Sequence, residues 1–148
     1  MRRLKAWAPA LVFMGVIYIM SAMPGDASGR TSGRLAGLLL SAVSFLFGPD
    51  AAAQMDMDIL HLLIRKGAHM TEYAILFLLY FRALRMESAK HPGLYALLLC
   101  AGYAATDEWH QGFVAGRGPS VIDVCIDTLG AGLAWGIVQI VQIKRKRN

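Results

Sequence analysis

Eleven polar side chains inside apolar stretches constrain this fold more than any other feature of the chain. A charge within or beside hydrocarbon is costly, so such residues are rare in membrane-spanning helices and usually face a protein interior or a wet cavity. They therefore indicate a candidate functional site. The eleven are Lys66, His69, Glu72, Tyr73, Asp107, Glu108, His110, Gln111, Arg117, Asp123 and Asp127.

The composition places the chain in the membrane class. Of its 148 residues, 56% are hydrophobic and 17% are charged, and the mean hydropathy of +0.46 is too high for an ordinary soluble domain of this size. We expect one small domain. Cys100 and Cys125 fall on different predicted helices at different depths, so we predict free thiols rather than a disulfide.

The first apolar stretch predicts a membrane span over about residues 4–23. Residues 6–23 carry no charge, follow a basic start and end before Pro24, which is close to the ~20 residues that a spanning helix needs. A secretory signal also has a basic start and an apolar run. However, Ser21-Ala22-Met23 is a poor cleavage site, so a retained span is favoured.

Residues 26–33 are rich in glycine, serine and aspartate and predict a loop. The following residues 35–47 have apolar side chains at helical spacing, but a run of about 13 residues is short for crossing a bilayer. We therefore expect an interfacial or re-entrant helix over about residues 34–47, ended by Gly48 and Pro49.

Three further spans are predicted at about residues 64–83, 93–113 and 120–143. The helix that contains residues 64–83 can extend outward to Asp56. In the last span, the small residues Gly130, Gly132, Ala134 and Gly136 predict close contact with a neighbouring helix. The predicted fold class is an all-α integral membrane bundle of four transmembrane helices plus the short helix, in a single domain over residues 1–148.

Basic residues predict the orientation, because short cytoplasmic loops carry an excess of lysine and arginine. With four spans and both termini inside, ten basic residues lie in the cytoplasm and five outside. A fifth span at 35–47 would put a basic terminus or the basic loop at 82–90 on the wrong side. The polar residues then face outward. The predicted partner is the lipid bilayer, and the net charge of +5 requires no nucleic acid.

Helix geometry predicts the depth of the polar residues, because an α-helix rises ~1.5 Å per residue. Glu72 lies roughly 15 Å from Arg82, near the middle of a ~30 Å hydrocarbon core, and His69 lies one turn further out. Asp107 lies before the point at which the third span leaves the hydrocarbon core, and Asp127 lies near the outer boundary of that core. Three helices thus bring polar groups into the same outer half.

Helical spacing also places these groups in rows, because residues three, four and seven apart share a face. The rows are Lys66, His69 and Tyr73 with Glu72 beside them, Asp107 and Gln111 with Glu108 beside them, and Asp123 with Asp127. His110 falls off the carboxylate row and is predicted to lie at a helix interface. Such faces can bind cations, hold phosphate or pass protons.

The run Asp-Glu-x-x-Gln-x-Phe-x-x-Gly-Arg at residues 107–117 is the most specific motif in the sequence. Together with Lys66, His69, Glu72, Tyr73, Asp123 and Gly130, it resembles the VanZ-like membrane proteins over nearly the whole chain. The resemblance implies a small protein of the bacterial cytoplasmic membrane, in a family with members linked to resistance against teicoplanin-type glycopeptide antibiotics. It implies no settled reaction. At Asp127 the family pattern more often has asparagine, so this site is either more acidic or lacks a neutral donor.

Two of the polar residues have local structural explanations. Ser120 and Asp123 have the spacing of a capping box, in which the pair satisfies backbone donors at a helix start. Arg117 is either a solvated loop charge or a phosphate anchor, because arginine binds phosphate through two parallel hydrogen bonds.

Metal binding and acid/base chemistry are both open to this set of side chains. Asp107, Glu108 and Asp127 supply oxygen ligands and His69 a nitrogen ligand for a divalent cation. The signal for a metal is weak, because the sequence has no HExxH or cysteine-rich zinc spacing. No cofactor is predicted. Glu72 and Asp107 can differ in protonation at neutral pH and so transfer protons, although His69 with Glu72 can equally be a pair that only fixes helix packing.

The sequence thus predicts an outward-facing pocket that recognises an amphiphile, either a lipid-linked envelope precursor or a glycopeptide or lipid tail. A small membrane enzyme acting on a phosphate- or sugar-bearing lipid is one alternative. A proton or ion pathway is another, but the apolar runs at 74–81 and 94–105 argue against it. The catalytic candidates are Asp107, Glu108, His69 and Glu72, and the substrate-binding candidates are Lys66, Tyr73, Gln111, Arg117, Asp123 and Asp127.

Overall fold

A computed structural model describes residues 2–147, and all regular structure within that range is α-helical, as predicted. The helices are α1 (Arg2–Ser21), α2 (Gly25–Phe47), α3 (Pro49–Ala53), α4 (Met57–Met86), α5 (Pro92–Gln111) and α6 (Val121–Arg147). The all-α fold class is therefore confirmed for this part of the chain.

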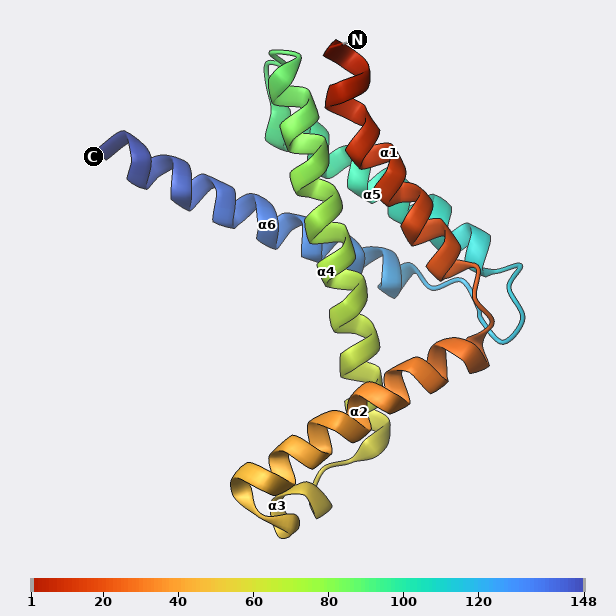
Figure 1. The fold of residues 1–148 in the computed structure, drawn as a ribbon. Helices are drawn as coiled ribbons and strands as arrows, with labels where there is room; N and C mark the ends of the chain where they lie inside the picture. The colour runs from red at the N-terminus through yellow and green to blue at the C-terminus, as the bar shows by residue number, and fades with distance from the viewer. Residues whose placement is uncertain (1, 148) are drawn as a thin grey trace.

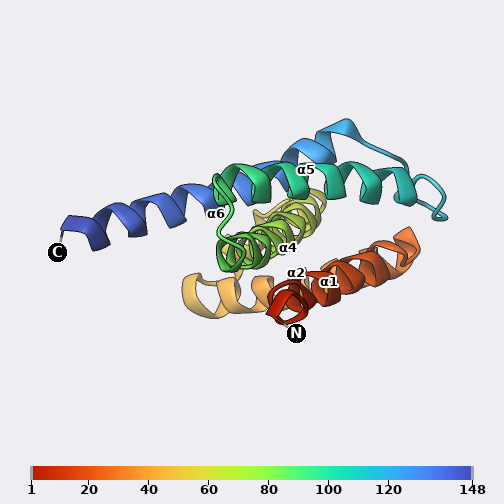
Figure 2. The ribbon, with the colours of Figure 1, turned by 90° about the horizontal axis from the view of Figure 1, so that it is seen from above.

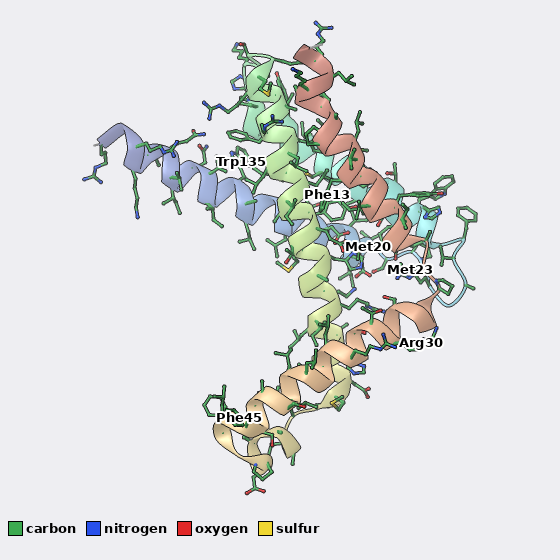
Figure 3. All side chains as sticks on the ribbon, in the orientation of Figure 1. Phe13, Met20, Met23, Arg30, Phe45 and Trp135 are labelled. Atoms are coloured by element: carbon green, nitrogen blue, oxygen red, sulfur yellow. The ribbon has the colours of Figure 1, made fainter. Side chains whose placement is uncertain are left out.

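Helix α4 is the central element of the fold. It contacts α1, α2, α5 and α6. Helix α6 crosses α4 near its middle, and the C-terminal half of α6 extends away from the other helices (Figures 1 and 2). Helices α2 and α3 form an arm at the N-terminal end of α4, with the exposed side chain of Phe45 near its tip (Figure 3). The candidate site residues on α4 consequently have neighbours from several elements.

The apolar core lies where α1, α4, α5 and α6 meet. Tyr73, Leu76 and Phe77 of α4 are fully buried in it. Small side chains such as Ala96 on α5 and Ala131 on α6 complete the core and let the helices approach closely. The two cysteines are free, as predicted: Cys100 is buried in the core, and Cys125 is exposed.

Gly130 produces the closest approach of two helices. A Cβ atom at Gly130 would overlap the backbone of Met70, so only glycine permits this contact between α6 and α4. The predicted contact at Ala134 is also present, because this side chain is buried. The prediction was wrong for Gly132 and Gly136, whose Cβ positions have no neighbour within 4 Å. These two glycines lie on faces of α6 that no other helix covers.

The predicted limits of the later helices agree closely with the structure. Asp56 caps α4 by accepting hydrogen bonds from the backbone N–H groups of Asp58 (2.9 Å) and Ile59 (3.3 Å), so the helix does extend to this residue. Helix α5 ends at Gln111, two residues before the predicted limit, and α6 begins one residue later than predicted and continues to Arg147.

The loop predicted at residues 26–33 is wrong, because α2 begins at Gly25 and runs as one helix to Phe47. Local preferences of glycine and serine for turns are overcome by contact with α4. Within the helix, the Ser32 hydroxyl donates to the carbonyl oxygens of Ser28 (3.2 Å) and Gly29 (3.0 Å), so it does not compete for the helical backbone donors. The helix ends as predicted, where Gly48 has a φ of 92°.

Two helices in the described range are long and apolar enough to cross a membrane, Arg3–Ser21 and Val121–Arg145. They coincide with the first and last predicted spans. Helices α4 and α5 do not reach this apolarity over a sufficient length. The count of four spans, and the interfacial placement of residues 34–47, stay predictions.

Candidate functional site

The ten candidate site residues lie on facing segments of three helices and one loop. Helix α4 carries Lys66, His69, Glu72 and Tyr73; α5 carries Asp107, Glu108 and Gln111; the 112–120 loop carries Arg117; and α6 carries Asp123 and Asp127. Five of them are buried, namely Tyr73, Asp107, Glu108, Gln111 and Asp127. The structure therefore brings together the residues that the sequence placed in one half of the bundle.

Two contacts between a basic and an acidic side chain join α4 to α6. The ammonium group of Lys66 contacts Asp123 Oδ1, and both side chains are largely but not fully covered. One turn along, His69 Nδ1 lies 3.7 Å from Asp127 Oδ1. The second pair is too long for a hydrogen bond. Its aspartate is only 1% exposed, so this carboxylate lies within protein.

The start of α6 is capped by residues of two helices. The Ser120 hydroxyl accepts a hydrogen bond from the backbone N–H of Asp123 (3.3 Å), which is half of the predicted capping box. The other half is absent, because the N–H of Ser120 donates instead to Glu108 Oε2 of α5 (2.8 Å). Asp123 is therefore available to pair with Lys66. The same α5 segment contains a hydrogen bond from Gln111 Nε2 to Asp107 Oδ2 (3.0 Å).

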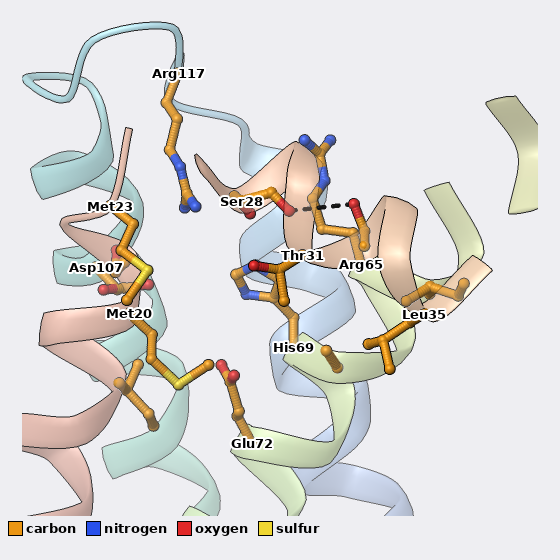
Figure 4. Close-up of a pocket in the computed structure, with 15 residues that line it drawn as sticks. Met20, Met23, Ser28, Thr31, Leu35, Arg65, His69, Glu72, Asp107 and Arg117 are labelled. Atoms are coloured by element: carbon orange, nitrogen blue, oxygen red, sulfur yellow. Dashed lines mark hydrogen bonds between the residues drawn. The ribbon is translucent and has the colours of Figure 1, made fainter. Parts of the chain in front are cut away.

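A tight turn directs Arg117 toward the buried carboxyl groups. Gly116 has a φ of 73°, a conformation that favours glycine, and the backbone N–H of Gly25 donates to the carbonyl oxygen of Ala115 (3.1 Å), which ties the loop to the start of α2. The guanidinium of Arg117 points from this loop toward Asp107 (Figure 4). Burial, followed by the nearby charge of Arg65, lowers the pKa of Arg117 from its ordinary value, yet arginine stays charged at neutral pH.

A cavity of about 120 Å³ lies between α1, α2, α4 and α5. One part of its wall is ionisable and includes His69, Glu72 and Asp107, with Arg65 and Arg117 near the loop (Figure 4). The rest consists of hydroxyl side chains, mainly from α2, and of apolar side chains from α1, α2, α4 and the turn between α1 and α2. These apolar lining residues include Ile17, Met20, Met23, Leu35 and Ile64. A second hollow of about 190 Å³ shares Arg65, His69 and Arg117 and reaches Gln111 and Asp123.

Several buried polar atoms of the candidate site residues have no hydrogen-bond partner. They are both carboxylate oxygens of Asp127, Asp107 Oδ1, the Tyr73 hydroxyl and His69 Nδ1. Asp107 and His69 line the cavity, as does Ser21, whose hydroxyl is also buried without a hydrogen-bond partner, whereas Tyr73 and Asp127 do not line it. Each such atom costs about 1–3 kcal/mol relative to a satisfied one. Unsatisfied groups are normally rare and dispersed. Their concentration here is what a site that meets its partners in a ligand would show.

The predicted metal ligands Asp107, Glu108, Asp127 and His69 are not arranged as a metal centre. Within residues 2–147, no group of three or more histidine, cysteine, aspartate or glutamate side chains has a geometry that could hold a metal ion. Glu108 is directed at the Ser120 backbone, and Asp127 faces His69.

His110 lies apart from the carboxylate row, as predicted. Its ring centroid is 4.5 Å from that of Tyr18, so it packs α5 against α1. Its Nδ1 atom is buried without a partner, but it does not line the cavity of about 120 Å³.

Sequence reasoning missed Arg65 and the polar wall supplied by α2. Arg65 lines both hollows, but in the sequence it counted only as one of the five basic residues predicted to lie outside. Ser28, Thr31 and Ser32 line the cavity from α2. Their spacing of three and four residues is that of one helix face, and this signal was hidden because the segment was interpreted as a loop.

Comparison with known proteins supports the resemblance found in the motif at 107–117. No curated protein and no solved structure matches the chain significantly. A family model described as VanZ/LLP1 matches residues 6–142, which is nearly the whole length. With two helices apolar enough to span a bilayer, this match indicates a membrane protein. The chain belongs to the VanZ/LLP1 family.

Proposed function

We propose that this protein recognises an amphiphile, with the head group in the ionisable part of the cavity and the tail along its apolar wall. The family's link to glycopeptide resistance makes a lipid-linked envelope precursor, or a glycopeptide with a lipid tail, the favoured class of ligand. The observation that carries the proposal is the composition of one cavity, which joins ionisable side chains to apolar ones. The ionisable residues are Arg65, Arg117, His69, Glu72 and Asp107, and the apolar residues are Ile17, Met20, Met23, Leu35, Ile64 and Ala68.

The charges of the cavity favour a head group that has both anionic and hydroxyl groups. Among the side chains that the structure describes, which do not include that of Asp26, neither Arg65 nor Arg117 has a carboxylate within ion-pair distance. We therefore infer that both guanidinium groups can bind phosphate oxygens. Asp107 Oδ1 is buried without a donor and lies on the same cavity. A carboxylate accepts hydrogen bonds from sugar hydroxyls, so a phosphate-linked sugar fits both sets of groups.

A membrane enzyme is the second candidate, and one observation favours it. His69 lines the cavity with Glu72 and Asp107, and its Nδ1 atom faces Asp127. A carboxylate behind an imidazole can orient the ring and stabilise its charged form during proton transfer. Of the four catalytic candidates, Glu108 fits chemistry least, because its carboxylate is occupied by the Ser120 backbone. His69, Glu72 and Asp107 would then act on a phosphate- or sugar-bearing lipid.

An ion pathway has weaker support. Beyond Glu72 the buried side chains of α4 are Tyr73, Leu76, Phe77, Tyr80 and Ala83, and those after Tyr73 are apolar except for the Tyr80 hydroxyl. The hydroxyls of Tyr80 and Tyr103 both reach Met14, at its sulfur (2.9 Å) and its carbonyl oxygen (2.7 Å), so they do not form a chain between the two ends.

The distribution of basic residues supports a protein of the bacterial cytoplasmic membrane with both termini in the cytoplasm and the cavity facing outward. Topology reporters fused after residue 148 and after Arg2 test this placement. Both fusions are expected to report a cytoplasmic location, and an external signal from either one contradicts the four-span prediction.

Arg117→Gln tests amphiphile recognition, and Arg34→Gln is the matched control. Arg34 is an exposed arginine of α2 that does not line the cavity. We expect Arg117→Gln to lower binding of the purified protein to a phosphate-linked lipid precursor, and teicoplanin tolerance in cells, by about tenfold, because a charge-assisted hydrogen bond contributes about 1.5–3 kcal/mol. Equal losses in both variants, with normal membrane insertion, contradict the proposal.

Asp107→Asn separates a binding protein from an enzyme. The substitution keeps the size of the side chain and removes its charge. A partial loss of affinity in Asp107→Asn, with no turnover of the precursor by the wild type, favours recognition without catalysis. Turnover of the purified precursor by the wild type, abolished in Asp107→Asn without loss of binding, establishes the enzyme instead.

A further inference from the structure

A separate cavity, of about 510 Å³, lies at the C-terminal end of α4, away from the candidate site. Its walls come from three elements. Arg85 stands at the end of α4, Lys90 and His91 lie in the turn that leads to α5, and Trp135 and Arg145 lie on α6. Arg85, Lys90 and Arg145 belong to the basic residues that predict the orientation of the chain, and the proposed function does not involve them.

The positive charge of this cavity is not compensated by the protein. Arg85, Lys90 and Arg145 are exposed, and none of them forms an ion pair with a carboxylate in residues 2–147. Glu87 is the only acidic residue between 73 and 106 in the sequence, and its carboxylate lies toward Arg3 (3.8 Å). No acidic residue follows Asp127. The cavity therefore attracts an anion.

The start of α5 adds backbone donors to the same cavity. Pro92 occupies the first turn, and His91 makes no side-chain capping hydrogen bond. The N–H groups of a helix start favour anions because of their orientation and of the helix dipole. Gly93 is buried, and the indole of Trp135 packs so closely against it that a Cβ atom would overlap the ring. The helix start and the aromatic wall thus form one side of the cavity.

Apolar surface continues directly from the cavity along α5. Leu94 lines the cavity and is 43% exposed, and Leu98, one turn further along the same face, is 59% exposed. On the other side, Phe81 lines the cavity and has the guanidinium of Arg85 5.8 Å from its ring centroid. An anion with an attached hydrocarbon chain matches both surfaces, whereas a small soluble anion matches only the charged one.

We propose that this cavity binds the phosphate head group of an anionic phospholipid, with the acyl chains against the apolar face at Leu94 and Leu98. Basic pockets between helices at a membrane surface hold such head groups by this combination of charge and adjoining hydrocarbon. The site is independent of the candidate site at the other end of α4. It also requires no particular orientation of the chain in the membrane.

Fluorescence of Trp135 provides a direct test with the purified full-length protein. In a Trp7→Phe, Trp109→Phe background, Trp135 is the single tryptophan, so phospholipids with brominated acyl chains report binding at this cavity by quenching. Phosphatidylglycerol is expected to quench at a concentration at least tenfold lower than phosphatidylcholine. Equal quenching by the two lipids overturns the proposal.

A pair of double variants distinguishes the cavity from general surface charge. Arg85→Gln with Arg145→Gln removes two charges from the cavity, and Lys144→Gln with Arg147→Gln removes two exposed charges that do not line it. The first variant is expected to lose roughly 30-fold in phosphatidylglycerol affinity, at about 1 kcal/mol for each basic residue, and the second to keep most of it. Equal losses in both variants overturn the proposal.

Inorganic phosphate and glycerol phosphate separate a lipid from a soluble anion. At millimolar concentrations they are expected to leave the quenching by brominated phosphatidylglycerol unchanged, because they lack the hydrocarbon chains. If either one displaces the lipid at a concentration equal to that of the lipid, the cavity is a soluble phosphate site and the lipid assignment is wrong.

Discussion

The region where α4 packs against its neighbouring helices has an apolar half and a polar half, and the two differ in whether buried polar atoms have hydrogen-bond partners. In the apolar half, around residues 76–83 of α4, the hydroxyls of Tyr80 and Tyr103 both find acceptors on Met14. In the polar half, around residues 66–73, both oxygens of Asp127 and the hydroxyl of Tyr73 are buried without a partner. Buried hydroxyls thus have hydrogen-bond partners in one part of α4 and lack them in the adjacent part.

This difference separates residues that stabilise the bundle from residues that are proposed to bind a ligand. Buried unsatisfied groups lower stability, so the polar half gives up free energy of folding that the apolar half must supply. Substitutions in the apolar half should therefore lower stability first and binding only as a consequence. Substitutions in the polar half should lower binding while leaving stability nearly unchanged or higher.

The largest expected effect is on the apolar half, at Phe77. This side chain is fully buried between the helices, and Phe77→Ala should lower the free energy of unfolding by about 3 kcal/mol through the cavity it leaves. Unfolding in mixed micelles with increasing SDS measures the change. The exposed Leu78→Ala is the control. A loss at Phe77 no larger than at Leu78 would show that the apolar half does not supply the stability.

Gly130 lies against Met70 in the polar half and is followed by Ala131 of the apolar core, so its substitution should damage both halves. A methyl group there would meet the Met70 backbone and push α6 from α4, which costs about 1–3 kcal/mol. It would also lengthen the contact between His69 and Asp127. We expect Gly130→Ala to lower both thermal stability in detergent and ligand binding. Gly132→Ala, where the added atom has no neighbour within 4 Å, should change neither.

A smaller effect is expected for the ion pair of Lys66 with Asp123 in the polar half. Lys66→Met and Asp123→Asn each leave one charge unpaired, whereas the double variant leaves none. A double-mutant cycle of unfolding free energies should therefore give a coupling of about 1 kcal/mol. Zero coupling would mean that the two side chains do not pair in the membrane-embedded protein.

An effect of similar size but opposite sign is expected at Asp127. The substitution Asp127→Asn replaces a buried carboxylate without donors by an amide whose N–H groups can donate to His69 Nδ1. It should therefore raise the free energy of unfolding by about 1 kcal/mol, measured in the same SDS titration. A lower free energy of unfolding in the variant would contradict this expectation and identify Asp127 as a group whose charge stabilises the fold.

The sequence predicted the polar half more successfully than the segment that encloses it. Helix periodicity placed His69, Asp107 and Asp127 in one row on each of three helices, and the rise per residue placed the three rows in the same half of the bundle. The possible extension of this helix outward to Asp56 was also predicted, and the structure shows Asp56 as the cap of α4. These features depend on local geometry, which a single sequence contains.

The enclosing wall depends on contacts distant in sequence and was not predicted. Residues 26–33 have the composition of a turn, yet they form the first part of α2 because α2 packs against α4 and is tied to the loop at Ala115. The role of Glu108 was missed for a similar reason. Capping-box rules pair Ser120 with Asp123 on one helix, and only the arrangement of α5 beside α6 brings Glu108 to the Ser120 N–H.

The divided cap makes the start of α6 independent of the pair between Lys66 and Asp123. Glu108 and the Ser120 hydroxyl together accept backbone hydrogen bonds at the start of α6, so the helix does not need the Asp123 carboxylate there. If the proposed ligand drew Asp123 away from Lys66, α6 would therefore stay wound. The protein with and without that ligand would then share one backbone.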